Sequence, residues 1–100
     1  MNKVSLWGYL ILLAIRHNPG VSGVKIIEII NNSISSGWNK ISVGTFYPTI
    51  AKLEANRWVK REEKPANEEE GRRQICWITE EGTKTLRSFE SLQASLKSLS

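Results

Sequence analysis

The side chains that most often perform catalysis or bind metals are sparse in this sequence of 100 residues. It contains one histidine, His17, one cysteine, Cys76, and no aspartate. A structural zinc site needs four ligands, which these two residues cannot supply. His17 ends an apolar segment, and Cys76 has no histidine nearby in sequence, so each is more typical of packing than of catalysis. The sequence therefore predicts no enzyme, metal site or cofactor.

Contact with a polyanion is the chemistry that the sequence favours. Thr45, Thr49 and Lys52 are spaced four and three positions apart, so a helix aligns them on one side, which we expect to lie opposite its apolar face. Threonine can contact base edges and lysine can neutralise a phosphate. We therefore expect the two threonines to read bases and Lys52 to hold the backbone. An ordinary solvated helix face is the alternative.

Further candidate residues for contact with a polyanion lie before and after the segment 45–52. Lys40 and the free N–H groups after Ser42 offer a phosphate contact at the helix start. Residues 60–73 contain five basic and five acidic residues, so their net charge is zero. The acidic run Glu68, Glu69 and Glu70 is more typical of a solvated tip than of a protein-docking site. The candidate DNA-binding residues are Lys40, Ser42, Thr45, Tyr47, Thr49, Lys52, Lys64, Arg72 and Arg73.

Hydrophobic periodicity predicts two helices before a polar loop at 32–40. Residues 5–17 are apolar on nearly every side, so this helix needs cover from its own core and from a second subunit. Asn18, Pro19 and Gly20 end it as a turn. A second helix runs from its cap at Ser22 to about Asn31. Its apolar stripe comprises Val24, Ile26, Ile27 and Ile30.

A third helix, a hairpin and a last helix follow. Behind the cap Ser42, a helix is predicted at 43–55, with Val43, Phe46 and Ile50 toward the core. Segments 58–63 and 73–78 suit two strands joined by a charged tip. Thr79 caps the last helix. Its apolar residues step at coiled-coil spacing: Phe89, Leu92, Leu96 and Leu99.

This order of elements predicts a mainly α fold with a small β-hairpin wing, a winged helix-turn-helix with a C-terminal dimerisation helix. The third helix would enter the major groove, and the wing would follow the flanking backbone. We expect residues 1–80 to form the DNA-binding domain and 81–100 the dimerisation helix of the same compact unit. The candidate dimer residues are Leu6, Tyr9, Leu10, Leu13, Phe89, Leu92, Leu96 and Leu99.

Size and charge agree with this prediction. A monomer of this length buries about two thirds of its unfolded surface, so a second subunit would add stability. The net charge of +4 and the pI of about 9.5 favour a polyanionic partner. A lone cysteine excludes an intrachain disulfide and fits the cytoplasm. The apolar run 4–15 resembles a signal-peptide core, but it lacks a cleavage site and is too short to span a membrane.

Three motifs resemble the PadR-like family of transcription regulators, over nearly the whole chain. ISVGTFYPTIAKLEANRWV at 41–59 is similar to the family's recognition helix, and WITEEG at 77–82 to its joint between wing and last helix. WGYLILLAI at 7–15 is similar to its first helix. The resemblance implies repression of transcription by dimers that form through the first and last helices.

Some positions depart from the family pattern. Val24 and Cys76 stand where the family usually has tyrosine, and Arg57 stands where it usually has glycine. Asn56 is then the expected left-handed cap. Pro48 removes a backbone donor within the third helix and crowds the carbonyl of Gly44, which predicts a local bend or a helix start at Pro48.

The leading hypothesis is a sequence-specific regulator that binds double-stranded DNA, a homodimeric repressor. The alternative is a winged-helix module for protein interaction, which the acidic tip favours. A small-molecule sensor is a further option, because some related regulators bind aromatic ligands between their last helices. No tryptophan lies on the last helix, although Trp7 could line a cavity in a dimer, so the identity of any effector stays open. The four tryptophans are Trp7, Trp38, Trp58 and Trp77.

Overall fold

Four helices and a three-stranded antiparallel sheet form the part of the chain that the computed structural model describes, residues 5–34, 39–65 and 72–98. In chain order the elements are α1 (Leu6–His17), β1 (Val21–Ser22), α2 (Gly23–Ser33), α3 (Val43–Ala55), β2 (Val59–Pro65), β3 (Arg72–Ile78) and α4 (Glu80–Lys97). The predicted helices are all present, and α3 has the predicted bounds.

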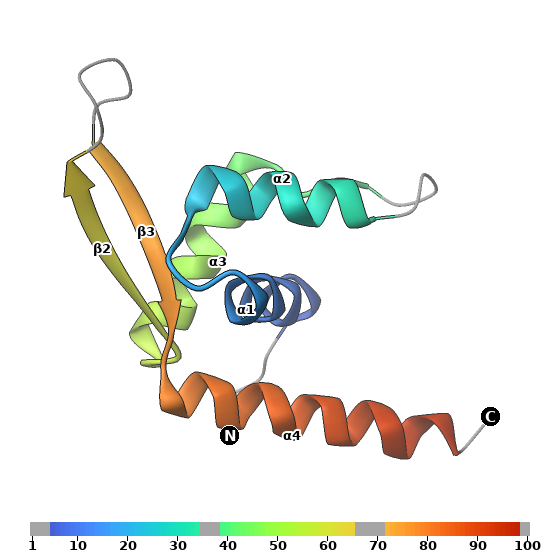
Figure 1. Cartoon of the computed structure of the whole chain (residues 1–100). Coiled ribbons are helices and arrows are strands. Elements are labelled where there is room, and N and C mark those ends of the chain that lie inside the picture. The colour runs from blue at the N-terminus through green and yellow to red at the C-terminus, as the bar shows by residue number, and fades with distance from the viewer. Residues whose placement is uncertain (1–4, 35–38, 66–71, 99–100) are drawn as a thin grey trace.

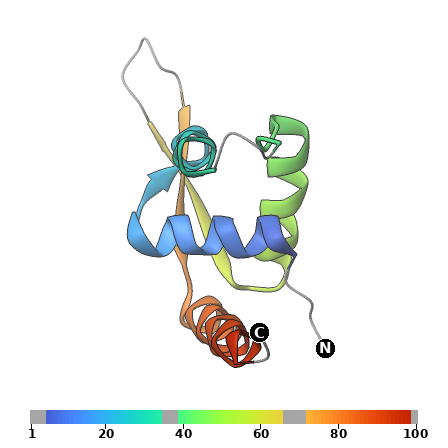
Figure 2. The same cartoon turned by 90° about the vertical axis from the view of Figure 1, so that its right-hand side faces the viewer.

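The first helix, α1, lies at the centre of the arrangement. It contacts α2, α3, α4 and β3. Figure 1 views α1 almost along its axis, with α2 on one side of it and α4 on the other. Figure 2 shows α1 crossing both of these helices, with α3 standing beside them. The C-terminal half of α4 extends past α1, away from the hairpin (Figure 1).

Side-chain caps explain where the helices begin. Ser22, Ser42 and Thr79 have extended backbones, and the hydroxyl oxygen of each accepts a hydrogen bond from the backbone N–H three residues later. Each cap thereby satisfies one of the N–H groups that a helix start leaves without a partner. Pro48 lies inside α3, so the alternative of a helix start at that residue is wrong.

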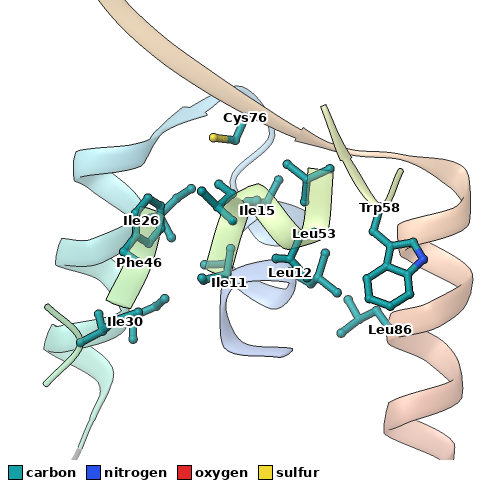
Figure 3. Close-up of a cluster of buried hydrophobic side chains, with 14 residues drawn as sticks. Ile11, Leu12, Ile15, Ile26, Ile30, Phe46, Leu53, Trp58, Cys76 and Leu86 are labelled. Atoms are coloured by element: carbon teal, nitrogen blue, oxygen red, sulfur yellow. The ribbon is translucent and has the colours of Figure 1, made fainter. Parts of the chain in front are cut away.

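The hydrophobic core forms where the apolar faces of α2, α3 and α4 pack around α1. Figure 3 shows the buried side chains of α1, α2, α3 and α4 pointing into one cluster, closed by Cys76 of β3. Two predicted core residues lie outside it, because Val24 is 70% exposed and Val43 is 60% exposed. Both valines sit in the first turn of their helices, at the edge of the apolar stripe, where the neighbouring elements do not reach.

The sheet contains a strand that the sequence did not predict. β1 pairs antiparallel with β3, which places Val21 opposite Cys76, and β3 also pairs with β2. Gly20 precedes β1 with φ of 76°, and its N–H donates to the Cys76 carbonyl at 3.0 Å. A Cβ at Gly20 would lie 2.9 Å from the Trp77 ring, so only glycine fits this turn without strain.

The chain leaves α3 through Arg57, and the expected left-handed cap at Asn56 is wrong. Asn56 has φ of −81°, whereas Arg57 has φ of 63°. The Trp58 N–H donates to the Leu53 carbonyl at 3.0 Å, which closes the helix end around Arg57. This closure requires a left-handed residue at position 57, where the family that the sequence resembles usually has glycine.

Replacing this strained residue should stabilise the protein. A left-handed backbone costs an L-residue about 1–2 kcal/mol, and glycine adds an entropic cost of about 0.5–1 kcal/mol. We therefore expect Arg57→Gly to raise the free energy of unfolding by about 0.5–1 kcal/mol. Urea unfolding followed by circular dichroism measures it. Arg57→Ala is the control, since it keeps the strain. An equal gain in both variants would assign the effect to the lost side chain instead.

Candidate nucleic-acid interface

The surface opposite α4 is built from α2, the start of α3 and the far end of the hairpin (Figures 1 and 2). Asn31 of α2 fixes the approach to α3. The N–H of Ile41 donates to Asn31 Oδ1 at 2.9 Å, and Asn31 Nδ2 donates to the Ile41 carbonyl at 3.1 Å. Because Ile41 directly precedes the cap Ser42, this pair of bonds sets where α3 begins.

The side of α3 that faces solvent is not the one predicted from the sequence, which was the side of Thr45, Thr49 and Lys52. Thr45 and Thr49 are half-buried and lie beside the apolar face, not opposite it. At 100° per residue, they fall on one flank of the line through the buried residues Phe46 and Ile50. The exposed residues of α3 are Val43, Gly44, Tyr47, Pro48, Ala51, Lys52 and Ala55.

The threonine hydroxyls have different hydrogen-bond capacity left for a ligand. The Thr49 hydroxyl donates to the Thr45 carbonyl at 2.7 Å, so its proton is used within the helix. The Thr45 hydroxyl accepts from the Ser42 hydroxyl at 3.3 Å and keeps its own proton. Thr45 can therefore donate to a base or phosphate, whereas Thr49 can only accept.

Three candidate lysines are available to a polyanion. Lys40, Lys52 and Lys64 are exposed, and none forms an ion pair with another described residue. Lys64 stands opposite Arg73 in the register of β2 and β3. The side chains of Arg72 and Arg73 lie outside the described part of the structure, as do Glu68, Glu69 and Glu70.

An ion pair that the sequence did not predict joins α3 to the wing. The Arg61 Nη2 of β2 donates to Glu54 Oε1 of α3 at 2.8 Å, and both side chains are partly covered. The hydrogen bond from Arg61 lowers the pKa of the Glu54 carboxyl and raises the pKa of the Arg61 guanidinium. The contact ties the base of the wing to the last turn of α3, so the two elements hold a set relative orientation.

Cys76 lies behind this pair, opposite Arg61 in the sheet register. Burial raises the pKa of its thiol to about 11. A thiol at that pKa stays protonated near neutral pH and is a poor nucleophile, which agrees with a packing role. Among residues 5–34, 39–65 and 72–98, no three His, Cys or Glu side chains gather to hold a metal ion.

The predicted dimer residues fall into two groups. Tyr9 and Phe89 stack within the chain at 4.5 Å between ring centroids, and the Tyr9 hydroxyl donates to Gln93 Oε1 at 3.3 Å. This contact, with the ion pair of Arg16 and Glu90 at 3.4 Å, holds α4 on α1.

The second group is open to solvent. Leu6 is exposed, Leu92 is 54% exposed and Leu96 is 52% exposed. Leu10 and Leu13 line a groove of about 230 Å³ between α1 and α2, together with apolar residues of α2. Leu99 lies outside the described residues. No helix in the part of the chain that the structure describes is long and apolar enough to cross a bilayer.

Known proteins share this sequence pattern and this arrangement. Residues 11–88 match the transcriptional regulator PadR-like family. A PadR family transcription regulator from Clostridium difficile R20291 superposes with a TM-score of 0.74 at 20% identity, over 91% of this chain and 92% of that chain. A PadR family transcriptional regulator from Eggerthella lenta DSM 2243 superposes with a TM-score of 0.72 at 22% identity, over 91% of this chain and 77% of that chain. No curated protein matches in sequence.

The fold extends to a second group of regulators. MarR superposes with a TM-score of 0.76 at 20% identity, over 95% of this chain and 61% of that chain. These structures are winged-helix proteins, so the predicted class, mainly α with a β-hairpin wing, is confirmed.

Proposed function

The chain belongs to the PadR-like family of transcriptional regulators, and from this premise we propose that it represses transcription by binding a specific double-stranded DNA site as a homodimer. The observation that carries the proposal is the start of α3, which lies on the same surface as α2 and the far end of the hairpin (Figures 1 and 2). Lys40 and Lys52, before and within α3, are exposed and form no ion pair with another described residue. A helix in this setting can enter the major groove while the hairpin contacts the flanking backbone.

The proposed DNA contacts divide by position along α3. The first turns carry Thr45 and Tyr47, which would meet base edges, with Lys40 before the cap Ser42. Lys52 lies two turns later, where a groove-bound helix approaches phosphates. Lys64, Arg72 and Arg73 of the hairpin would hold the adjacent backbone. Thr49 contributes a half-buried methyl and an acceptor oxygen to the same flank.

The proposed dimer uses the leucines that the single chain leaves uncovered. Leu92 and Leu96 are exposed on the C-terminal half of α4, and the groove beside Leu10 and Leu13 offers an apolar surface of matching chemistry. Association of two subunits would cover both surfaces. Two α3 helices about 34 Å apart would then meet successive major grooves on one side of the duplex.

The salt dependence of DNA binding tests the proposed phosphate contacts. We expect Lys52→Ala to weaken binding to specific and random duplexes by similar factors. It should also make the slope of log affinity against log salt shallower by about one unit per subunit. Fluorescence anisotropy at several salt concentrations measures both. Lys84→Ala is the matched control, because Lys84 lies on α4 and pairs with Glu80. Affinity that does not depend on salt would contradict the proposal and favour a protein-interaction module.

A further inference from the structure

The exposed side of α3 is almost without hydrogen-bonding groups. Of its exposed residues, Val43, Gly44, Pro48, Ala51 and Ala55 have no polar side-chain atom. Lys52 is polar but lies toward the C-terminal end, where it is suited to a phosphate. The exposed side of α3 is therefore apolar over the first turns of the helix, and the half-buried Thr45 hydroxyl lies at its flank.

Tyr47 adds little polar character to this surface. Its ring packs edge-on against Phe46, with 5.0 Å between the centroids. A Cβ built on Gly23 would lie 3.7 Å from the Tyr47 hydroxyl, so this hydroxyl is held against the start of α2. The tyrosine therefore borders the exposed side of α3, with its polar end turned toward α2.

The residue types exclude most direct readout from this helix. Paired hydrogen bonds to guanine use arginine or lysine, and those to adenine use asparagine or glutamine. Residues 41–51 contain none of these four types and no acidic residue to accept from cytosine. Only one base carries a distinctive apolar group in the major groove, the C5-methyl of thymine. An apolar helix surface in that groove is complementary to thymine.

We infer that α3 recognises thymine by methyl contact, with Val43 packed against a C5-methyl group in the major groove. Val43 is suited to this role because it begins α3 and is 60% exposed. The unpaired Lys40 and Lys52 lie on either side of the apolar surface along the chain, as phosphates border the groove. The inference rests on the proposed DNA binding, and it names what the bound site must contain.

Replacement of thymine by uracil tests this inference, because uracil lacks only the C5-methyl. A preferred duplex is first selected from a random library with the full chain, and each of its thymines is then replaced singly. We expect at least one replacement per half-site to weaken binding about fourfold, the factor that corresponds to one buried methyl group. Equal affinity for every uracil duplex, or a preferred duplex without thymine, would overturn the inference.

A protein variant locates the contact. Val43→Ala should weaken binding to the thymine duplex by a similar factor and bring the thymine-to-uracil affinity ratio toward one. Val24→Ala is the matched control, since it truncates another exposed valine, in the first turn of α2, and should keep the ratio. A ratio lost in Val24→Ala but kept in Val43→Ala would overturn the assignment. Absence of any duplex binding at low salt would instead contradict the proposed function.

Discussion

Gly82→Ala should destabilise the protein severely, although alanine is the better helix former. Gly82 lies in the first turn of α4, where a Cβ would overlap the Trp58 carbonyl oxygen and lie 2.9 Å from Ile78 Cγ1. The same carbonyl accepts a hydrogen bond from the Thr79 N–H at 2.9 Å, so it cannot move aside freely. We expect a loss of about 3 kcal/mol, at the upper end for overpacking, because the obstacle is backbone.

Thermal unfolding measures this loss. For a domain of this size, it corresponds to a fall in Tm of about 12–24 °C. Gly44→Ala is the matched control, since Gly44 also lies in a first helical turn and a Cβ there would meet only Ser42 Oγ at 3.8 Å. That variant should be as stable as the parent or more stable by about 0.5–1 kcal/mol. A Gly82→Ala protein with the parental Tm would show that α4 does not pack on the Trp58 carbonyl.

The double substitution Leu92→Glu with Leu96→Glu should separate the two subunits of the proposed dimer. In a single chain these side chains are half-exposed, so two carboxylates there cost little. In the proposed dimer both would enter an apolar contact, and burying unpaired charges costs several kcal/mol. We expect sedimentation to show a monomer. We also expect at least a hundredfold loss of affinity for the selected duplex, because only one half-site is bound at a time.

The matched control for this experiment is Ser91→Glu with Ser95→Glu. It adds the same charge to the same exposed half of α4, one position earlier at each site, and so on a different side of the helix. It should remain dimeric. A dimer that survives the leucine substitutions, with its melting temperature unchanged, would place the subunit contact on another surface.

Local features of the fold were predictable from the sequence. The caps Ser22, Ser42 and Thr79 and the periodic apolar residues behind them define where helices begin, because a cap and its helix interact within a few residues. The base of the hairpin was predictable for a similar reason, since the alternating residues of the two strands flank one charged tip.

The candidate site was predictable only in part. The spacing of Thr45, Thr49 and Lys52 predicts that they share one side of a helix, and the helix geometry agrees. The spacing could not show which side of α3 other elements of the fold bury, because residues at the edge of an apolar stripe are buried or exposed according to their neighbours. Val43 was therefore predicted to face the core, whereas its side chain is exposed in the structure.

Tertiary structure alone decided the long-range contacts. β1 is two residues long, too short for any periodic signal, and exists because β3 offers it hydrogen-bond partners more than fifty positions away. Arg57 adopts the left-handed conformation because α3 must turn there to place Trp58 in the core. The sequence determined where the helices lie through short-range periodicity, and its charge predicted a polyanionic partner. The packing of distant segments determined which side chains remain free to meet DNA, because burial depends on neighbours that are remote in the chain.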